Sequence, residues 1–272
     1  MKDNKKRKPA VAGQFYPANA ERLKSLVERM VEEDQERKET VCVVSPHAGL
    51  EFSGYVAGAV FSSVELPSKF ILLGPNHRNV QSGISIMKEG VWETPLGDVP
   101  VDDSLAESVM SHSNLIQEDT RAHFLEHSLE VQLPFLQYYK NDISIVPFSI
   151  APMVSYEELE ELGTAVASSI QESSGNVLIV ASTDMSHFVS QETAKKKDFL
   201  AIEQILNLNP RGLYEVVTKE NISMCGFQPT TSALVASKKL GAQEGSLIKY
   251  QTSGDIIGNF NEVVGYAGVR IT

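Results

Sequence analysis

Residues 70–79, FILLGPNHRN, join an apolar run to a polar turn that contains a histidine. The run FILL has the length and composition of a short strand that is buried on both faces of a sheet. The chain then breaks at Gly74-Pro75 and presents His77. One interpretation is a turn that happens to contain a histidine. The other is a strand end that directs an imidazole into a cleft.

Two further apolar runs end in the same way. The run VCVV leads to His47, and the run VLIVAS leads to Asp184 and His187, so three of the six histidines follow a predicted strand. Open α/β sheets bind ligands beyond the carboxyl ends of their strands. We therefore expect His47, His77 and His187 to line one cleft. The competing interpretation is that histidines are common in loops and that loops follow strands.

Apolar runs alternate with amphipathic segments along the chain. Residues 155–174 begin with Ser155 and several glutamates, as expected of a capped helix. A helix over 126–139 contains Pro134, which should kink or interrupt it. Continuous apolar runs between helices indicate a sheet covered on both faces, so we predict an α/β fold, a three-layer α/β/α sandwich around a mixed sheet. Other expected helices are 19–34, 190–206, 210–219 and 228–241, and expected strands include 69–77, 142–150 and 262–271.

The composition fits one domain with a large core. The chain has 272 residues, of which 42% are hydrophobic. We expect a single domain over residues 9–272, preceded by a basic, solvated tail over residues 1–8 that contains the cluster KKRK. The 35 acidic residues outnumber the 24 basic ones, and the net charge of −11 argues against nucleic-acid binding, which needs a basic surface.

Cysteine content and hydropathy predict the cellular setting. Two cysteines cannot form a disulfide framework, and no apolar run approaches the ~20 residues of a membrane span. The start of the sequence is charged where a signal peptide would be apolar. We therefore expect a cytoplasmic protein that binds neither nucleic acid nor a membrane.

His47 and His77 are the natural pair of metal ligands, because neutral imidazole suits Zn, Cu, Fe and Ni. A strong site needs a third ligand. Cys225 is a candidate because it precedes a predicted helix, whose N-terminus would favour a thiolate. The alternative is that Cys225 is a small buried hydrophobe, which is how free cysteine usually behaves. Cys42 lies inside an apolar run and is expected in the core.

Asp184 and His187 are three residues apart on one turn, where a carboxylate could orient an imidazole as a general acid or base. In the alternative, Asp184 is a helix N-cap and His187 is a surface residue. His123 and His127 would share one face of a helix. Their spacing is that of a zinc-protease signature, but the glutamate does not follow the first histidine as that signature requires. We expect His127 to line the pocket and His123 to be structural.

Seven ordered motifs, spread over residues 9–270, resemble those of the Memo family (mediator of ErbB2-driven cell motility). They are AVAGQFYP, SPHAGLEFSGYVAG, LLGPNH, TPLGDVPVD, EHSLEVQLPFL, STDMSHF and MCGFQPT. Prokaryotic members of this family are also called AmmeMemoRadiSam system protein B. The family fold is similar to that of the class III, LigB-type extradiol dioxygenases, which implies an α/β sandwich with a cleft at one end of the sheet.

The resemblance also implies a site. His47 and His77 match the histidine ligands of the dioxygenase iron, and His187 matches the acid-base histidine. Cys225 stands where the dioxygenases have a carboxylate. A thiolate is softer and is itself oxidisable, so the set suits Fe or Cu, with Zn also accommodated, and does not favour ring cleavage. The implied function is that of a metal-dependent redox protein or oxidoreductase, with a pocket of His47, His77, His127, Asp184, His187 and Cys225.

An alternative is a non-catalytic module that binds a peptide or a small anionic or aromatic ligand in the same cleft. Eukaryotic relatives imply binding of phosphotyrosine peptides. In prokaryotes the resemblance implies association with an AMMECR1-like protein and a radical-SAM protein.

Overall fold

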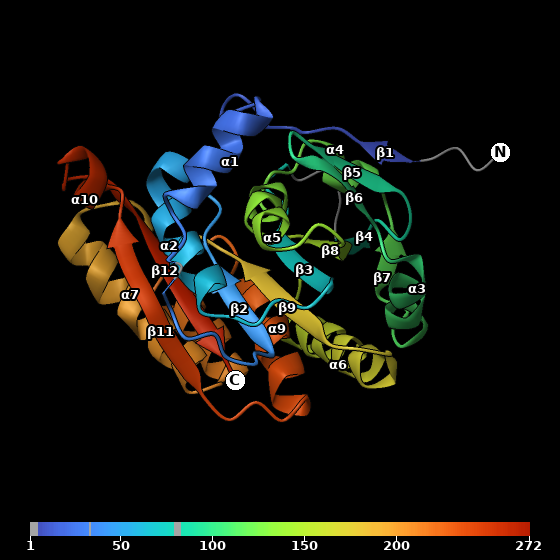
Figure 1. The fold of residues 1–272 in the computed structure, drawn as a ribbon. Coiled ribbons are helices and arrows are strands. Elements are labelled where there is room, and N and C mark those ends of the chain that lie inside the picture. The colour runs from blue at the N-terminus through green and yellow to red at the C-terminus, as the bar shows by residue number, and fades with distance from the viewer. Residues whose placement is uncertain (1–4, 33, 79–82) are drawn as a thin grey trace.

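A mixed sheet forms the centre of the protein in the computed structural model, which describes residues 5–32, 34–78 and 83–272 (Figure 1). The strand order is β10-β12-β2-β9-β3-β8-β4-β7, and β11 also pairs with β12. The four middle strands run parallel, whereas β12 is antiparallel to β2 and β4 is antiparallel to β8. The middle strands are β2 (Cys42–Ser45), β9 (Val177–Ser182), β3 (Lys69–Pro75) and β8 (Ser144–Ile150). The outer strands are β12 (Val263–Ile271), β11 (Gly245–Thr252), β10 (His187–Val189), β4 (Ile84–Ile86) and β7 (Ile116–Glu118).

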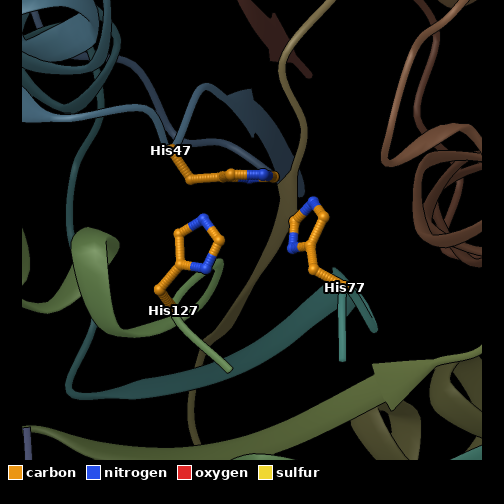
Figure 2. A group of neighbouring side chains, drawn as sticks. All are labelled: His47, His77 and His127. Atoms are coloured by element: carbon orange, nitrogen blue, oxygen red, sulfur yellow. The ribbon is translucent and has the colours of Figure 1, made fainter. Parts of the chain in front are cut away.

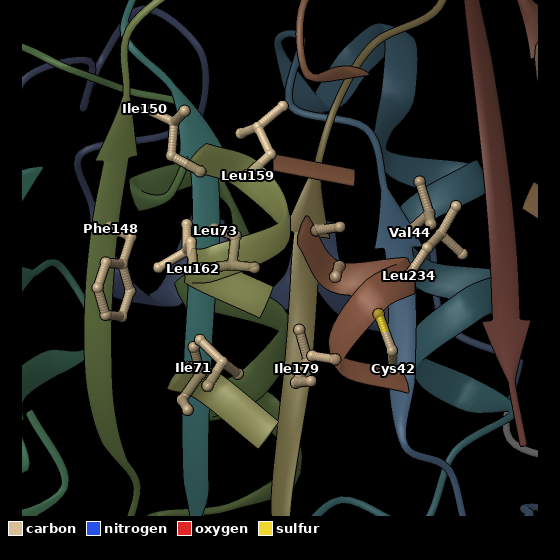
Figure 3. Close-up of a cluster of buried hydrophobic side chains, with 14 of the residues drawn as sticks. Cys42, Val44, Ile71, Leu73, Phe148, Ile150, Leu159, Leu162, Ile179 and Leu234 are labelled. Atoms are coloured by element: carbon tan, nitrogen blue, oxygen red, sulfur yellow. The ribbon is translucent and has the colours of Figure 1, made fainter. Parts of the chain in front are cut away.

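Helices cover both faces of this sheet, which confirms the predicted α/β sandwich (Figure 1). In β3, Ile71 and Leu73 pack into one apolar layer, and Phe70 and Leu72 pack into the other. Figure 3 shows the first layer, where Leu159, Leu162 and Leu234 lie over the strands. That layer holds α3 (Asp103–Ser111), α6 (Tyr156–Glu172), α7 (Gln191–Leu206), α8 (Pro210–Lys219) and α9 (Phe227–Lys239). The second holds α1 (Ala20–Glu28), α2 (Leu50–Ser62) and α5 (Leu133–Tyr139).

Local sequence signals set the ends of several helices. Ser155 and Glu158 form a reciprocal capping box at the start of α6, as the sequence predicts. Pro134, in contrast, does not interrupt a helix over 126–139. It lies in the first turn of α5, where a backbone N–H would have no acceptor within the helix, so proline costs no hydrogen bond there. The preceding residues form only a 3-10 turn, η1 (Glu130–Gln132). None of the helices among the described residues is both long and apolar enough to cross a membrane.

Within the basic cluster at residues 5–8, Lys5, Lys6 and Lys8 are exposed, as expected, but Arg7 is not. Lys6–Arg7 form β1, which joins a small sheet with β5 (Val91–Thr94) and β6 (Gly97–Pro100). The Arg7 side chain is fully buried, pairs with Glu130 and lies 4.3 Å above the Trp92 ring. The expectation of solvation is therefore wrong for Arg7, because the buried carboxylate of Glu130 neutralises the charge of its guanidinium. Residues 1–4 of the expected tail lie outside the described residues.

Candidate metal centre

Three histidine rings meet beyond the carboxyl ends of the middle strands. His47 follows β2 and His77 follows β3, and both strands pair with β9. Their ring centroids are 5.2 Å apart. The ring of His127 lies 4.8 Å from that of His77 and 5.7 Å from that of His47. Figure 2 shows the three imidazoles turned toward a common space.

The ring of His47 is held in one orientation by the end of β9. Its Nδ1 lies 2.9 Å from the hydroxyl of Ser182, which donates its own proton to the carbonyl of Ser128 and so accepts from the ring. Nδ1 therefore bears the proton, and the lone pair of Nε2 points away from Ser182. Nε2 lies 3.4 Å from Sγ of Cys225. Burial lowers the pKa of His47 well below its usual value, which keeps the ring neutral.

Glu126 holds His77 in place through hydrogen bonds. The sequence did not predict Glu126 as part of the site. The Glu126 carboxylate is 1% exposed and accepts from the backbone N–H of His77 at 2.6 Å and from its Nδ1 at 2.9 Å. Burial alone would raise the pKa of Glu126, but the bonds from His77 and Ser128 hold it below the usual range. Its position directly before His127 was the available signal, but no sequence pattern links it to His77.

Cys225 and Asp184 contact each other, and each also contacts His47. Asp184 accepts from the backbone N–H of His47 at 2.8 Å, and its own N–H points at Sγ of Cys225 from 3.2 Å. Burial and the negative charge of Asp184 raise the pKa of the Cys225 thiol, so the expected lowering by the following helix does not prevail. Asp184 is not a helix N-cap, since Ser190 caps α7.

His187 and His123 lie outside the three-histidine group. The Nδ1 of His187 is 2.9 Å from the carbonyl of Ser223, which leaves Nε2 of that ring as the acceptor. His123 belongs to the short helix α4 (Arg121–Phe124), which ends before His127. The two histidines therefore do not share a helix face, and His123 is buried against Trp92, with ring centroids 5.9 Å apart.

Two sets of side chains among the described residues could hold a metal ion. One set is His47, His77 and His127, and the other is His47, Asp184 and Cys225. Within each set the ligand atoms lie within 4.8 Å of one another. The set expected from the sequence, His47 with His77 and Cys225, is divided between them, and His47 belongs to both. Imidazole, thiol and carboxylate donors fit a transition metal, and Nδ1 of His127 is buried without a hydrogen bond.

Comparison with known proteins identifies the family. A family model described as Memo-like protein matches residues 7–270. The chain is 41% identical over 277 residues to the MEMO1 family protein MK0963 of Methanopyrus kandleri, with 97% of this chain and 98% of that protein covered. It is 40% identical over 275 residues to a MEMO1 family protein of Pyrobaculum arsenaticum, again with 97% and 98% covered. The solved structure of the uncharacterized protein JW3007 from Escherichia coli K12 shares only the fold, with a TM-score of 0.60 at 15% identity over 86% of this chain and 100% of that one. The chain therefore belongs to the Memo family.

Proposed function

We propose that this protein binds one iron or copper ion through His47 and Cys225, with His77 of the adjoining three-histidine set as the third ligand after a local movement of its turn, and that the bound metal serves a redox reaction. The observation that carries the proposal is the approach of Nε2 of His47 to Sγ of Cys225 at 3.4 Å. The hydrogen bond from Nδ1 to Ser182 leaves the Nε2 lone pair free to bind a metal, and a thiol beside it supplies a second donor. Two such atoms at this separation can bind one ion after a small adjustment.

The chemistry of the donors favours iron or copper, with zinc also accommodated. A bound metal would lower the pKa of the Cys225 thiol and supply redox or Lewis-acid chemistry to a ligand in the cleft. Thiolate donors favour softer metals, and a sulfur in place of the dioxygenase carboxylate does not favour cleavage of aromatic rings. The similarity to LigB-type dioxygenases therefore stays a prediction about ancestry, and it does not define the reaction.

Two neighbouring side chains are suited to proton handling. The carbonyl of Ser223 fixes Nδ1–H of His187, so Nε2 of His187 is the nitrogen that can accept or deliver a proton. Asp184 accepts from the backbone N–H groups of His47 and Ala48, at 2.8 and 3.3 Å, and so holds the turn that carries His47. We assign His187 to proton transfer and Asp184 to orientation of His47 and modulation of Cys225.

Anaerobic reconstitution tests this proposal. Purified protein is incubated with Fe(II), Cu(I) or Zn(II), desalted and analysed by mass spectrometry of its metal content. We expect about one Fe or Cu per chain, and a loss of at least about tenfold in affinity in His47→Ala and Cys225→Ser, because each substitution removes a ligand.

The matched controls are His112→Gln, an exposed histidine beside Glu172, and Cys42→Ser, a cysteine inside the core. We expect the folded controls to keep the metal content of the unmodified protein. Equal metal retention in His47→Ala, Cys225→Ser and the controls would show that the metal, if any, lies elsewhere.

A further inference from the structure

We propose that Glu126 is a positioning residue that sets the tautomer and the orientation of His77 and places the backbone of His127 at the same centre. The consequence for metal binding rests on the proposed function. The tautomer itself is a property of the metal-free protein and can be measured without any metal.

The Glu126 carboxylate is itself buried and accepts four hydrogen bonds. Oε2 accepts from the backbone N–H of His77 at 2.6 Å. Oε1 accepts from Nδ1 of His77 at 2.9 Å and from the N–H groups of His127 and Ser128 at 2.8 and 2.9 Å. One side chain therefore ties the turn after β3 to residues 126–128, which lie about 50 positions later in the sequence.

These contacts determine which nitrogen of His77 carries the proton. An ionised carboxylate can only accept hydrogen bonds, so the nitrogen that lies 2.9 Å from it must be a donor. Nδ1 of His77 is therefore protonated, and the lone pair belongs to Nε2. Because Glu126 binds both the backbone N–H and the ring of His77, the ring cannot rotate without breaking a hydrogen bond to a buried carboxylate.

The same arrangement holds His47, although by a different group. The Ser182 hydroxyl accepts from Nδ1 of His47, so both rings present Nε2 as the free nitrogen. Metal-binding histidines commonly donate their second ring N–H to a carboxylate or carbonyl, which orients the ring and raises its basicity. Glu126 also accepts from the backbone N–H of His127, whose ring stacks on that of His77 with centroids 4.8 Å apart and an interplanar angle of 23°.

The inference is tested by long-range 1H–15N NMR of metal-free, 15N-labelled protein at about pH 8, above the ~6.5 of a free imidazole. The His77 signals are assigned with a His77→Gln variant. We expect the Nδ1–H tautomer for both His77 and His47 in the unmodified protein. In Glu126→Leu no acceptor remains for Nδ1–H, so His77 should lose its preference for that tautomer and populate Nε2–H, while His47, bound to Ser182, does not change.

Asp119→Asn is the matched control. Asp119 is a buried carboxylate seven positions before Glu126, and its partners are the side chain and N–H of Arg121, with no imidazole among its hydrogen bonds. We expect this variant to keep the His77 tautomer. Fe(II) affinity should fall about 10–100-fold in Glu126→Leu and should not change in Asp119→Asn.

The outcomes separate the two proposals. An Nε2–H tautomer of His77 in the unmodified protein overturns the role of Glu126, even if the protein binds metal, and this measurement does not depend on the variant folding. An unchanged His77 tautomer in folded Glu126→Leu overturns it as well. The expected tautomers in a protein that binds no metal would support the role of Glu126 and remove the proposed function.

Discussion

His123 and His127 are four residues apart, yet their rings lie in different parts of the molecule. His127 faces the candidate metal centre, whereas His123 packs against Trp92, over whose ring Arg7 lies. Burial, aided by the positive charge of Arg7, lowers the pKa of His123 to about 3. The protein therefore keeps this ring neutral over a pH range in which an exposed histidine becomes charged.

This difference predicts a pH dependence of stability. An unfolded chain protonates His123 near pH 6.5, whereas the folded protein does so only near pH 3. The unfolded state binds the extra proton, so the contribution of His123 to the free energy of unfolding decreases as the pH falls through this window, by at most about 1.4 kcal/mol per pH unit. In His123→Phe, which keeps a ring against Trp92, urea unfolding should show a shallower dependence between about pH 4 and 6.5.

The exposed His112 offers the control, since His112→Gln should leave the slope almost unchanged. An identical slope in His123→Phe and the unmodified protein would contradict the assignment of this ring as the buried titrating group.

At the scale of elements, β1 shows how a strand of two residues can be fixed by one charged side chain. Arg7 pairs with the fully buried Glu130, which also accepts from Tyr16 and from the N–H groups of Ala10 and Val11. Arg7 further donates from Nε to the carbonyl of His123 at 3.0 Å. The N-terminal segment is therefore tied to the segment that carries Glu126 and His127.

Removing this charge should destabilise the whole protein. Arg7→Met leaves Glu130 buried and unpaired, and breaking a buried pair in this way costs about 3–5 kcal/mol. Adding Glu130→Gln removes the stranded charge, so the double variant should regain about 1 kcal/mol or more relative to Arg7→Met. Thermal or urea unfolding measures both effects.

Lys6→Met is the adjacent control. Among the described residues Lys6 pairs with the partly exposed Glu93 and Asp98, and its loss should leave stability unchanged. If Arg7→Met were as stable as Lys6→Met, the buried pair would not be what holds β1 in place.

Periodicity and capping predicted the long elements well, because their signals are local. The apolar run of β3 and the Ser155 cap of α6 are visible within a few residues of sequence. The hairpin of β5 and β6 is not among the strands expected from the sequence. Burial of Arg7 could not be predicted locally either, because its partner Glu130 lies 123 positions away.

At the scale of the whole molecule, the order of strands predicts where the fold opens. β3 and β9 each pair with two parallel neighbours and are buried on both faces, whereas β7 pairs only with β4 and lies at the edge of the sheet. We expect amides of β3 and β9 to exchange only on global unfolding, with protection on the order of a hundredfold or more above that of β7. Hydrogen exchange followed by mass spectrometry measures this, and equal rates in the two regions would contradict it.

The position of the candidate site also follows from this scale. Because β2, β3 and β9 run parallel, their carboxyl ends share one edge, which is why His47 and His77 could be placed together from sequence, whereas His187 lies outside the three-histidine group. Glu126 could not, since it reaches the centre from an irregular segment between α4 and η1. The division of the expected ligands into two sets depends on side-chain placement, which strand order does not determine.

The pairing of β2 with β12 has a consequence for biosynthesis. Val44 lies opposite Val269, so β2 emerges from the ribosome long before one of its two neighbours exists. At bacterial or eukaryotic rates of about 5–20 residues per second, the intervening chain takes roughly 10–45 s to make. During that interval an apolar strand edge is open to association with other nascent chains, and a chaperone that shields residues 42–45 would raise the yield of folded protein.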